Sequence, residues 1–384
     1  MRRFALGSII LALFAPAVLA GPKEDLAKVW TKGADALVKL QLADGGWVMK
    51  AMGETSDVAM TGMALQALAG TEEGKKKYAE AIAKGCDYLL KNQDKDGAIH
   101  NASSVPRLSN YKTAIAVMAL AAADKVKHKD AIAKGVTWLT GHQYSEDAAG
   151  DFKVDAKDGK NGGAGYGENP GKEGPAADLS NTSYMLEALN AAEIPKDSDV
   201  YKRALKYIAH CQNRSESNDG PGFDKLGLVV GDDGGFFYRV GESKAEKETL
   251  PNGKVALRSY GSMTYSGYKS FIFAGLGKDD PKVKAAMGWI EKHYTLDENP
   301  NMGQKGLYYY YNVFATALDI SGMDEIKDAD GETHRWAEEL VAKLATLQKA
   351  DGTWAGDPKW WEDMDPLPTL YSMIALGKAS RHLK

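Results

Sequence analysis

The sequence has few cysteines, no strong net charge and no long apolar run beyond residue 20. Cys86 and Cys211 are too few for a disulfide scaffold or a thiolate zinc cluster, and no Cys-x-x-Cys or His-x-x-x-His pair occurs. A net charge of −4 from 48 basic and 52 acidic residues leaves no basic footprint for nucleic acid. These absences predict a globular protein without a metal, a cofactor or a nucleic-acid partner.

Residues 1–20 have the composition of a secretory signal peptide. Arg2 and Arg3 form a basic start, Phe4–Leu13 an apolar core, and Val18–Ala20 a small-residue cleavage pattern. The core is too short for a lasting transmembrane helix. We therefore expect an exported product, periplasmic or extracellular, that begins at Gly21 and has no transmembrane segment.

One stretch recurs along the remaining chain, which we treat as a single repeat domain over residues 21–384. Lys32–Trp47, KGADALVKLQLADGGW, combines the end of an amphipathic helix with a Gln, a glycine stop and a Trp. Further copies are Lys84–Ile99, Lys134–Gln143, Arg203–Gln212, Lys284–Tyr294, which lacks the Gln, and Glu339–Trp354. The glutamines of the first three copies, Gln41, Gln93 and Gln143, recur about every fifty residues, and such recurrence indicates a repeat architecture.

Each copy is followed by a helical segment that is apolar nearly all round, as in Ser56–Gly70 and Leu108–Ala123. Such a helix is buried on every side, whereas the amphipathic copies have one solvated face. The chain therefore predicts an all-α fold of about twelve helices in six outer–inner pairs. Pairs of this kind stack on their neighbours, either into a closed ring or into an open superhelix.

The repeat resembles the QW repeat of squalene–hopene and oxidosqualene cyclases, a fold type shared with protein prenyltransferase β subunits. Lys32, Gly33, Gln41, Gly45 and Trp47 match it fully. The resemblance implies a single (α/α)6 toroid, in which the Gln amides brace adjoining helices and the Trp rings stack on them. It gives this structural role to Gln41, Trp47, Gln93, Gln143, Gln212, Gln348 and Trp354.

The catalytic pattern of the cyclases is not recognisable. Those enzymes protonate their substrate with an Asp-x-Asp-Asp run, and the nearest string here has Asp363 and Asp365 followed by Pro366. The two carboxylates are weak catalytic candidates, and capping of the last inner helix explains them better. The Asp, Cys and His that hold zinc in prenyltransferases have no counterpart, since both cysteines fall in outer copies.

Two connections, about 144–177 and 213–259, are longer than the repeat needs, and the second is expected to contain a small β-hairpin formed by residues 232–243 and 252–260. Polar and aromatic residues gather at the starts of the inner helices. Because all these starts lie at one end of a ring, we expect them to line a central pocket that opens there. The residues are Tyr111, Asp178, Asn181, Tyr184, Tyr260, Tyr265, Tyr268, Tyr308, Tyr311 and Asn312.

The sequence therefore predicts an exported toroid whose tyrosine-lined pocket binds an apolar isoprenoid-like or a sugar-like ligand. Three alternatives stay open: a cyclase-like isomerase or prenyl-transfer enzyme, a polysaccharide lyase or hydrolase, and an interaction scaffold. Whether the protein is an enzyme, and its oligomeric state, do not follow from the sequence.

Overall fold

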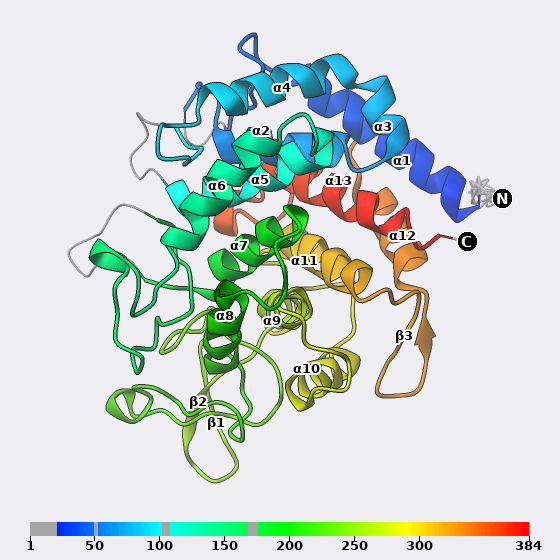
Figure 1. The fold of residues 1–384 in the computed structure, drawn as a ribbon. Helices are drawn as coiled ribbons and strands as arrows, with labels where there is room; N and C mark the ends of the chain where they lie inside the picture. Colours follow the sequence, from blue (N-terminus) through cyan, green and yellow to red (C-terminus); the bar gives the residue numbers. More distant parts are fainter. Residues whose placement is uncertain (1–20, 50–52, 102–107, 168–175, 384) are drawn as a thin grey trace, which may run out of the picture.

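The computed structural model describes residues 21–49, 53–101, 108–167 and 176–383, so the expected signal peptide lies outside the described residues. Within them the chain forms a closed ring of alternating outer and inner helices (Figure 1). The outer helices are α1 (Pro22–Lys39), α4 (Ala79–Lys91), α6 (Lys129–Gly141), α8 (Asp199–His210), α10 (Pro281–Lys292) and α12 (Trp336–Leu347). The inner helices are α2 (Val58–Leu68), α5 (Ser109–Asp124), α7 (Leu179–Ala191), α9 (Gly261–Phe273), α11 (Leu307–Ile320) and α13 (Leu367–Ala379). The short α3 (Glu72–Lys77) precedes α4.

The inner helices close on themselves. Each packs on the next in chain order, and α13 returns to pack on α2, while α1 packs on α12 and α13. The predicted toroid is confirmed, and the open superhelix is excluded. Within the described chain no helix is long and apolar enough to cross a membrane.

Small residues let the two layers approach closely. A side chain at Gly85 would place its Cβ 2.7 Å from Leu65 of the neighbouring inner helix. Gly45 ends the first repeat with φ +89°, and a Cβ there would lie 2.4 Å from the Lys84 carbonyl oxygen of the next outer helix. Both positions therefore require glycine, which explains why the repeat carries it.

The repeat glutamines join consecutive outer segments. The Gln41 amide nitrogen donates to the Gly45 carbonyl at 2.8 Å and to the Ala81 carbonyl of the next repeat at 2.9 Å. The other four donate in the same way, Gln348 reaching the Val29 carbonyl and so linking the last outer helix to the first. Trp47 and Trp354 are buried, and each indole N–H donates to a carbonyl of the preceding outer helix.

Tyr294 stands at the junction where the repeat has no glutamine, between α10 and α12. Its hydroxyl donates to the Glu339 carboxylate at 2.9 Å, and its ring stacks on His334 with centroids 4.1 Å apart. A side-chain pair thus takes the place of the amide-to-backbone bridge. The hairpin of β3 (Ile326–Lys327) and β4 (Thr333–His334) is inserted at the same point, and the sequence did not predict it.

The second long connection contains the expected hairpin, but its first strand lies further along the chain than predicted. β1 (Lys247–Thr249) pairs antiparallel with β2 (Val255–Leu257), and residues 232–243 form no strand of this sheet. Those residues instead carry the buried Phe236, whose ring contacts Phe271 of α9, and the buried Phe237, whose ring contacts Phe223 of the same connection.

We expect Gln143→Leu to lower the free energy of unfolding by roughly 1–3 kcal/mol, because two buried carbonyls lose their donor. The Gln143 side chain is fully buried and bonds Gly162 and Val200. Urea unfolding measures the change, with Gln304→Leu as the control because Gln304 donates a similar bond in an exposed position. Equal effects of the two substitutions would show that the repeat amides do not brace the ring.

Candidate functional site

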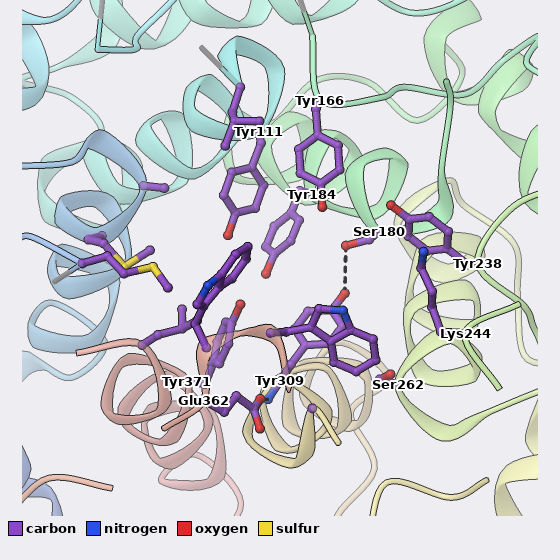
Figure 2. Close-up of a pocket in the computed structure, with 18 of the residues that line it drawn as sticks. Tyr111, Tyr166, Ser180, Tyr184, Tyr238, Lys244, Ser262, Tyr309, Glu362 and Tyr371 are labelled. Atoms are coloured by element: carbon purple, nitrogen blue, oxygen red, sulfur yellow. Dashed lines mark hydrogen bonds between the residues drawn. The ribbon is translucent and has the colours of Figure 1, made fainter. Parts of the chain in front are cut away.

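A cavity of about 280 Å³ opens at the N-terminal end of the inner helices. All six inner helices, or the residues just before them, contribute to its wall, because the chain runs in the same direction through each. Phenol rings dominate the lining, and Figure 2 shows several of their hydroxyls directed toward the same space. The seven lining tyrosines are Tyr111, Tyr166, Tyr184, Tyr238, Tyr260, Tyr309 and Tyr371.

Apolar side chains complete most of the wall. They are Met49, Met60, Leu108, Met263, Trp360, Trp361 and Leu367. Methionine adapts to irregular ligand shapes, and tyrosine offers an apolar ring with one polar tip. A lining of this kind suits a ligand that is mainly apolar and carries a small polar group.

The phenol hydroxyls differ in how they are satisfied. Tyr309 contacts Ser180 at 3.1 Å and Ser266 at 3.4 Å, which tie α11 to α7 and α9. The Tyr184 hydroxyl is buried and has no hydrogen-bond partner in the described structure. A buried hydroxyl without a partner is costly, so this group is available to a polar atom of a ligand.

The cations of the lining are paired with carboxylates. Lys112 is 3% exposed and lies 2.8 Å from Asp57, whose carboxylate also caps α2. Lys244 pairs with Glu242 and lies 4.5 Å from the centroid of the Tyr238 ring. These pairs neutralise the positive charge of the wall.

Glu362 provides a buried carboxyl group at the cavity. Its oxygens accept hydrogen bonds from the backbone N–H groups of Tyr308 and Tyr309, at 3.2 and 2.8 Å, in the first turn of α11. Burial raises the pKa of Glu362 to about 7, although those N–H groups act in the opposite direction. The group can therefore gain or release a proton near neutral pH, as an acid or base catalyst requires.

Three of the six non-glycine residues with positive φ in the described chain lie at the rim of the cavity. Leu108, Trp360 and Trp361 have φ values of 52°, 58° and 63°, a left-handed region that large side chains rarely adopt. Trp360 and Trp361 belong to the 3-10 segment Lys359–Trp361, and the Trp361 side chain is 47% exposed. Strained residues of this kind gather at functional sites.

The Trp361→Gly variant tests whether the strained residue Trp361 contributes to ligand binding. Glycine adopts a positive φ without cost, so we expect the free energy of unfolding to stay equal or to rise by up to about 1 kcal/mol. Loss of the indole should weaken ligand binding about tenfold. Thermal unfolding and a binding titration measure the two effects. Leu226→Ala is the control, because Leu226 is 51% exposed and lies outside the lining. Unchanged binding in Trp361→Gly would contradict the account.

The structure places three of the sequence-predicted residues, Tyr111, Tyr184 and Tyr260, in the wall. Asp178 and Asn181 lie beside it without lining it. Asp178 caps α7 through the Asn181 N–H at 2.8 Å and also accepts from the Asn181 amide at 2.7 Å. Burial raises the pKa of Asp178 to about 6.

The remaining predicted aromatic residues lie away from the cavity. Tyr308 donates to the Ala355 carbonyl in the connection between α12 and α13, and Tyr311 donates to the Leu296 carbonyl in the connection between α10 and α11. Tyr265 packs against Tyr310 and Phe314, at the contact between α9 and α11. Tyr268 and Asn312 are also buried outside the lining. Of the four consecutive tyrosines only Tyr309 faces the axis, because a helix spreads them around its circumference.

The weak catalytic candidates do not line the cavity either. The chain turns outward after Glu362, so Asp363 is exposed and Asp365 is half-buried beyond the wall. Sequence reasoning missed Glu362 itself, together with Tyr166, Tyr238, Tyr309, Tyr371, Trp360 and Trp361. The adjacent Trp360 and Trp361 directly before Glu362 were the feature of the sequence that could have indicated this part of the site.

Metal-ligand spacing occurs once in the described chain, and it lies outside the ring cavity. Asp328, Glu332 and His334 bring one ligand atom each within 4.8 Å, in the β3–β4 hairpin. His334 already bonds Asp328 at 3.3 Å and Glu339 at 3.1 Å. These contacts account for the cluster as part of the α10–α12 junction.

The fold is similar to solved structures of two kinds of enzyme. The type II terpene cyclase MstE from Scytonema, in complex with geranylgeranyl dihydroxybenzoate, has a TM-score of 0.53 and 12% identity, over 94% of this chain and 99% of that one. An inactive variant of an α-1,6-mannanase from Salegentibacter, in complex with α-1,6-mannotriose, has a TM-score of 0.59 and 11% identity, over 94% and 100%. No family model and no curated protein matches the chain. At identities this low, the structural similarity establishes a shared α/α-toroid fold alone, and this is the fold that the repeat had predicted.

Proposed function

We propose that the protein binds an uncharged, isoprenoid-like ligand in the cavity at the N-terminal end of the inner helices. The observation that carries this proposal is the wall of tyrosine, tryptophan and methionine side chains around about 280 Å³. Small-molecule sites commonly enclose about 300–1,000 Å³, so the cavity suits a short apolar chain.

The charges of the wall favour an uncharged ligand. Lys112 and Lys244 are each paired with a carboxylate, so binding a diphosphate would require those pairs to break. Glycan cleavage requires two carboxyl groups that flank the bond. Asp57 and Glu362 both line the cavity, but Asp57 already pairs with Lys112 and caps α2. These contacts support an isoprenoid-like ligand over a glycan.

A second candidate function, acid-catalysed isomerisation of such a ligand, is favoured by Glu362. Its carboxyl group is 1% exposed, lines the cavity and has its pKa raised to about 7 by burial. In its protonated form it would give a proton to the ligand, the tyrosine rings would stabilise the developing cation, and the carboxylate so formed would take a proton back from a neighbouring carbon to yield the isomer. Product analysis after incubation with a prenyl alcohol, with Glu362→Gln as the control, distinguishes catalysis from binding alone.

Export also belongs to this proposal. The support is the composition of residues 1–20, with a basic start, an apolar core and a small-residue cleavage pattern. The mature chain would begin at Gly21 and meet its ligand outside the cytoplasm. The mass of the protein purified from an exporting host tests this directly.

Native mass spectrometry of the mature protein tests the function. We expect one adduct of an apolar ligand, or the uptake of one molecule of farnesol, and a weaker adduct in Trp361→Gly. An adduct of an oligosaccharide, or no adduct with added farnesol, would contradict the proposal.

A further inference from the structure

A second cavity, of about 670 Å³, lies at the opposite end of the ring. The C-terminal ends of the same six inner helices form it, and its rim carries charged residues such as Asp319 and Arg381. Its wall includes the apolar side chains of Met118, Phe273 and Ile374 together with polar ones such as Gln66, Glu187 and Thr316. The ring therefore has one chamber at each end of its axis.

The residues that line the two chambers lie on the same faces of the same helices. On α5, Tyr111 lines the first chamber and Met118 the second, with the buried Ile115 between them. On α13, Tyr371 lines the first chamber, and Ile374, one turn further on, lines the second. Spacings of three and four residues keep these side chains on one face of each helix. A line along the axis thus passes from one chamber to the other through few side chains.

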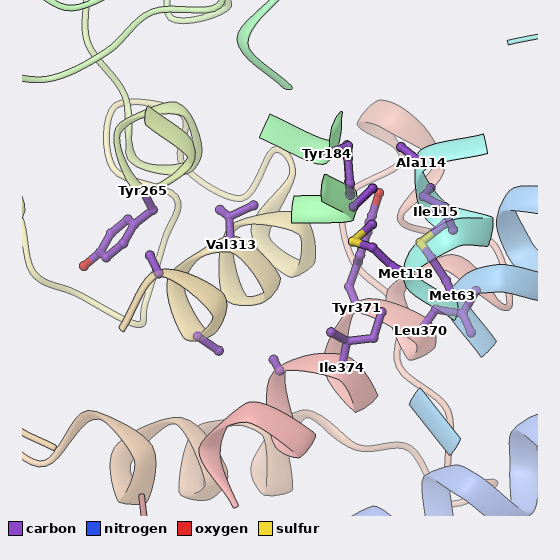
Figure 3. Close-up of a cluster of buried hydrophobic side chains, with 14 of the residues drawn as sticks. Met63, Ala114, Ile115, Met118, Tyr184, Tyr265, Val313, Leu370, Tyr371 and Ile374 are labelled. Atoms are coloured by element: carbon purple, nitrogen blue, oxygen red, sulfur yellow. The ribbon is translucent and has the colours of Figure 1, made fainter. Parts of the chain in front are cut away.

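A thin partition, which we call the septum, separates the two chambers and consists of the side chains of Tyr184, Tyr371, Met118 and Ile374. Tyr184 and Tyr371 face the first chamber, and Met118 and Ile374 face the second. Figure 3 shows the four in one cluster, which also contains Met63 and Leu370. Their exposed fractions of 5–8% reflect the space on either side, whereas Met63 and Leu370 are 1% and 0% exposed.

We infer that the septum sets the length of the apolar chain that the protein accepts, with the second chamber as the unused continuation of one ligand tract. The inference rests on the proposed function. Tyr184 and Tyr371 form the floor on which the end of the chain would rest. Truncating the floor together with the methionine behind it connects the two chambers, so a longer chain can enter.

The α9 side of the axis does not form part of the septum, because a polar network occupies it. Lys269 of α9 lies 2.7 Å from Glu187 of α7, and Ser266 bonds Ser270 and contacts Tyr309. Burying an apolar chain against an ion pair gains less than burying it against methionine and isoleucine. The length of the tract is therefore controlled by the septum residues of α5, α7 and α13.

The experiment compares the binding of geraniol, farnesol and geranylgeraniol by wild-type protein and by Tyr184→Ala/Met118→Ala. We expect wild type to prefer the shorter alcohols, and the double variant to bind geranylgeraniol at least tenfold more tightly than wild type does. The matched control is Met63→Ala/Leu370→Ala, which removes buried side chains of the same cluster that line neither chamber. The control should lose stability but keep the wild-type order.

A milder pair, Tyr184→Leu/Met118→Val, secures the test if the alanine variant does not fold, and it should shift the order in the same direction by a smaller factor. A folded septum variant with the wild-type order would overturn the inference. The same result would leave the proposed function standing. Failure of wild type to bind any of the three alcohols would overturn the proposed function itself.

Discussion

Replacing Lys269 with Met should lower the free energy of unfolding by about 3–5 kcal/mol, because the Glu187 carboxylate would remain buried without its partner. The two side chains are 2% and 15% exposed, and their charged atoms lie 2.7 Å apart between α9 and α7. Burial acts to raise the pKa of Glu187, but the positive charges of Lys269 and Lys378 outweigh it and leave that pKa below its usual value. The pair should therefore stabilise the ring above the usual carboxyl pKa and lose this effect as the pH falls.

Denaturant unfolding of three variants measures this contribution. Lys202→Met is the matched control, since Lys202 pairs with Asp199 on the surface, where the side chains are 63% and 78% exposed, and such pairs contribute little. Lys269→Met/Glu187→Gln should recover part of the loss, because no charge is then left buried. A loss no greater in Lys269→Met than in Lys202→Met would mean that the pair does not hold α7 to α9.

Glu362 should make the stability of the protein depend on pH in the opposite direction. Its folded-state pKa of about 7 lies above the usual 4.5, so the folded state keeps a proton that the unfolded state releases. The contribution is present in full below the unfolded pKa and is lost as the pH rises through the folded pKa. One pKa unit corresponds to about 1.4 kcal/mol, so the change between about pH 4 and about pH 8 should be about 3 kcal/mol.

Glu362→Gln isolates this effect, because the amide has a similar shape and does not titrate. The difference in unfolding free energy between wild type and Glu362→Gln should change by that amount across the range, whereas Asp178, with a pKa of about 6, contributes equally to both proteins. Ligand binding should follow the same curve, since an uncharged ligand is compatible with the protonated carboxyl group. A difference that does not vary with pH would contradict the placement of Glu362 as a buried, titrating group.

The sequence predicted the ring because the outer helices carry a periodic signal. Counterparts of Gln41, Gly45 and Trp47 recur in later repeats. Each makes contacts with the backbone that depend on its residue type, such as the two hydrogen bonds that the Gln41 amide donates to carbonyl groups. A pattern that is repeated along the chain can be read without knowledge of tertiary contacts. The missing glutamine before Tyr294 was also visible, although the side-chain pair that replaces it was not.

The cavity residues were harder to predict, because the inner helices are buried on every side. Nothing in the order Tyr308–Tyr311 shows which ring faces the axis and which contacts the connections outside it, since all four positions are at least partly covered. In the structure, Tyr309 is the one of these four tyrosines that lines the cavity. Glu362 was missed for a related reason: a charged residue beside Asp363 resembles an exposed cap, and only the packing of the ring buries it.

Calorimetric titration of the mature protein with farnesol and with mannotriose tests the central claim most directly. The account predicts that farnesol binds with one molecule per chain and a negative heat-capacity change, the signature of apolar burial, and that Trp361→Gly weakens this binding about tenfold. Binding of mannotriose in place of farnesol, or farnesol binding that Trp361→Gly leaves unchanged, would contradict it.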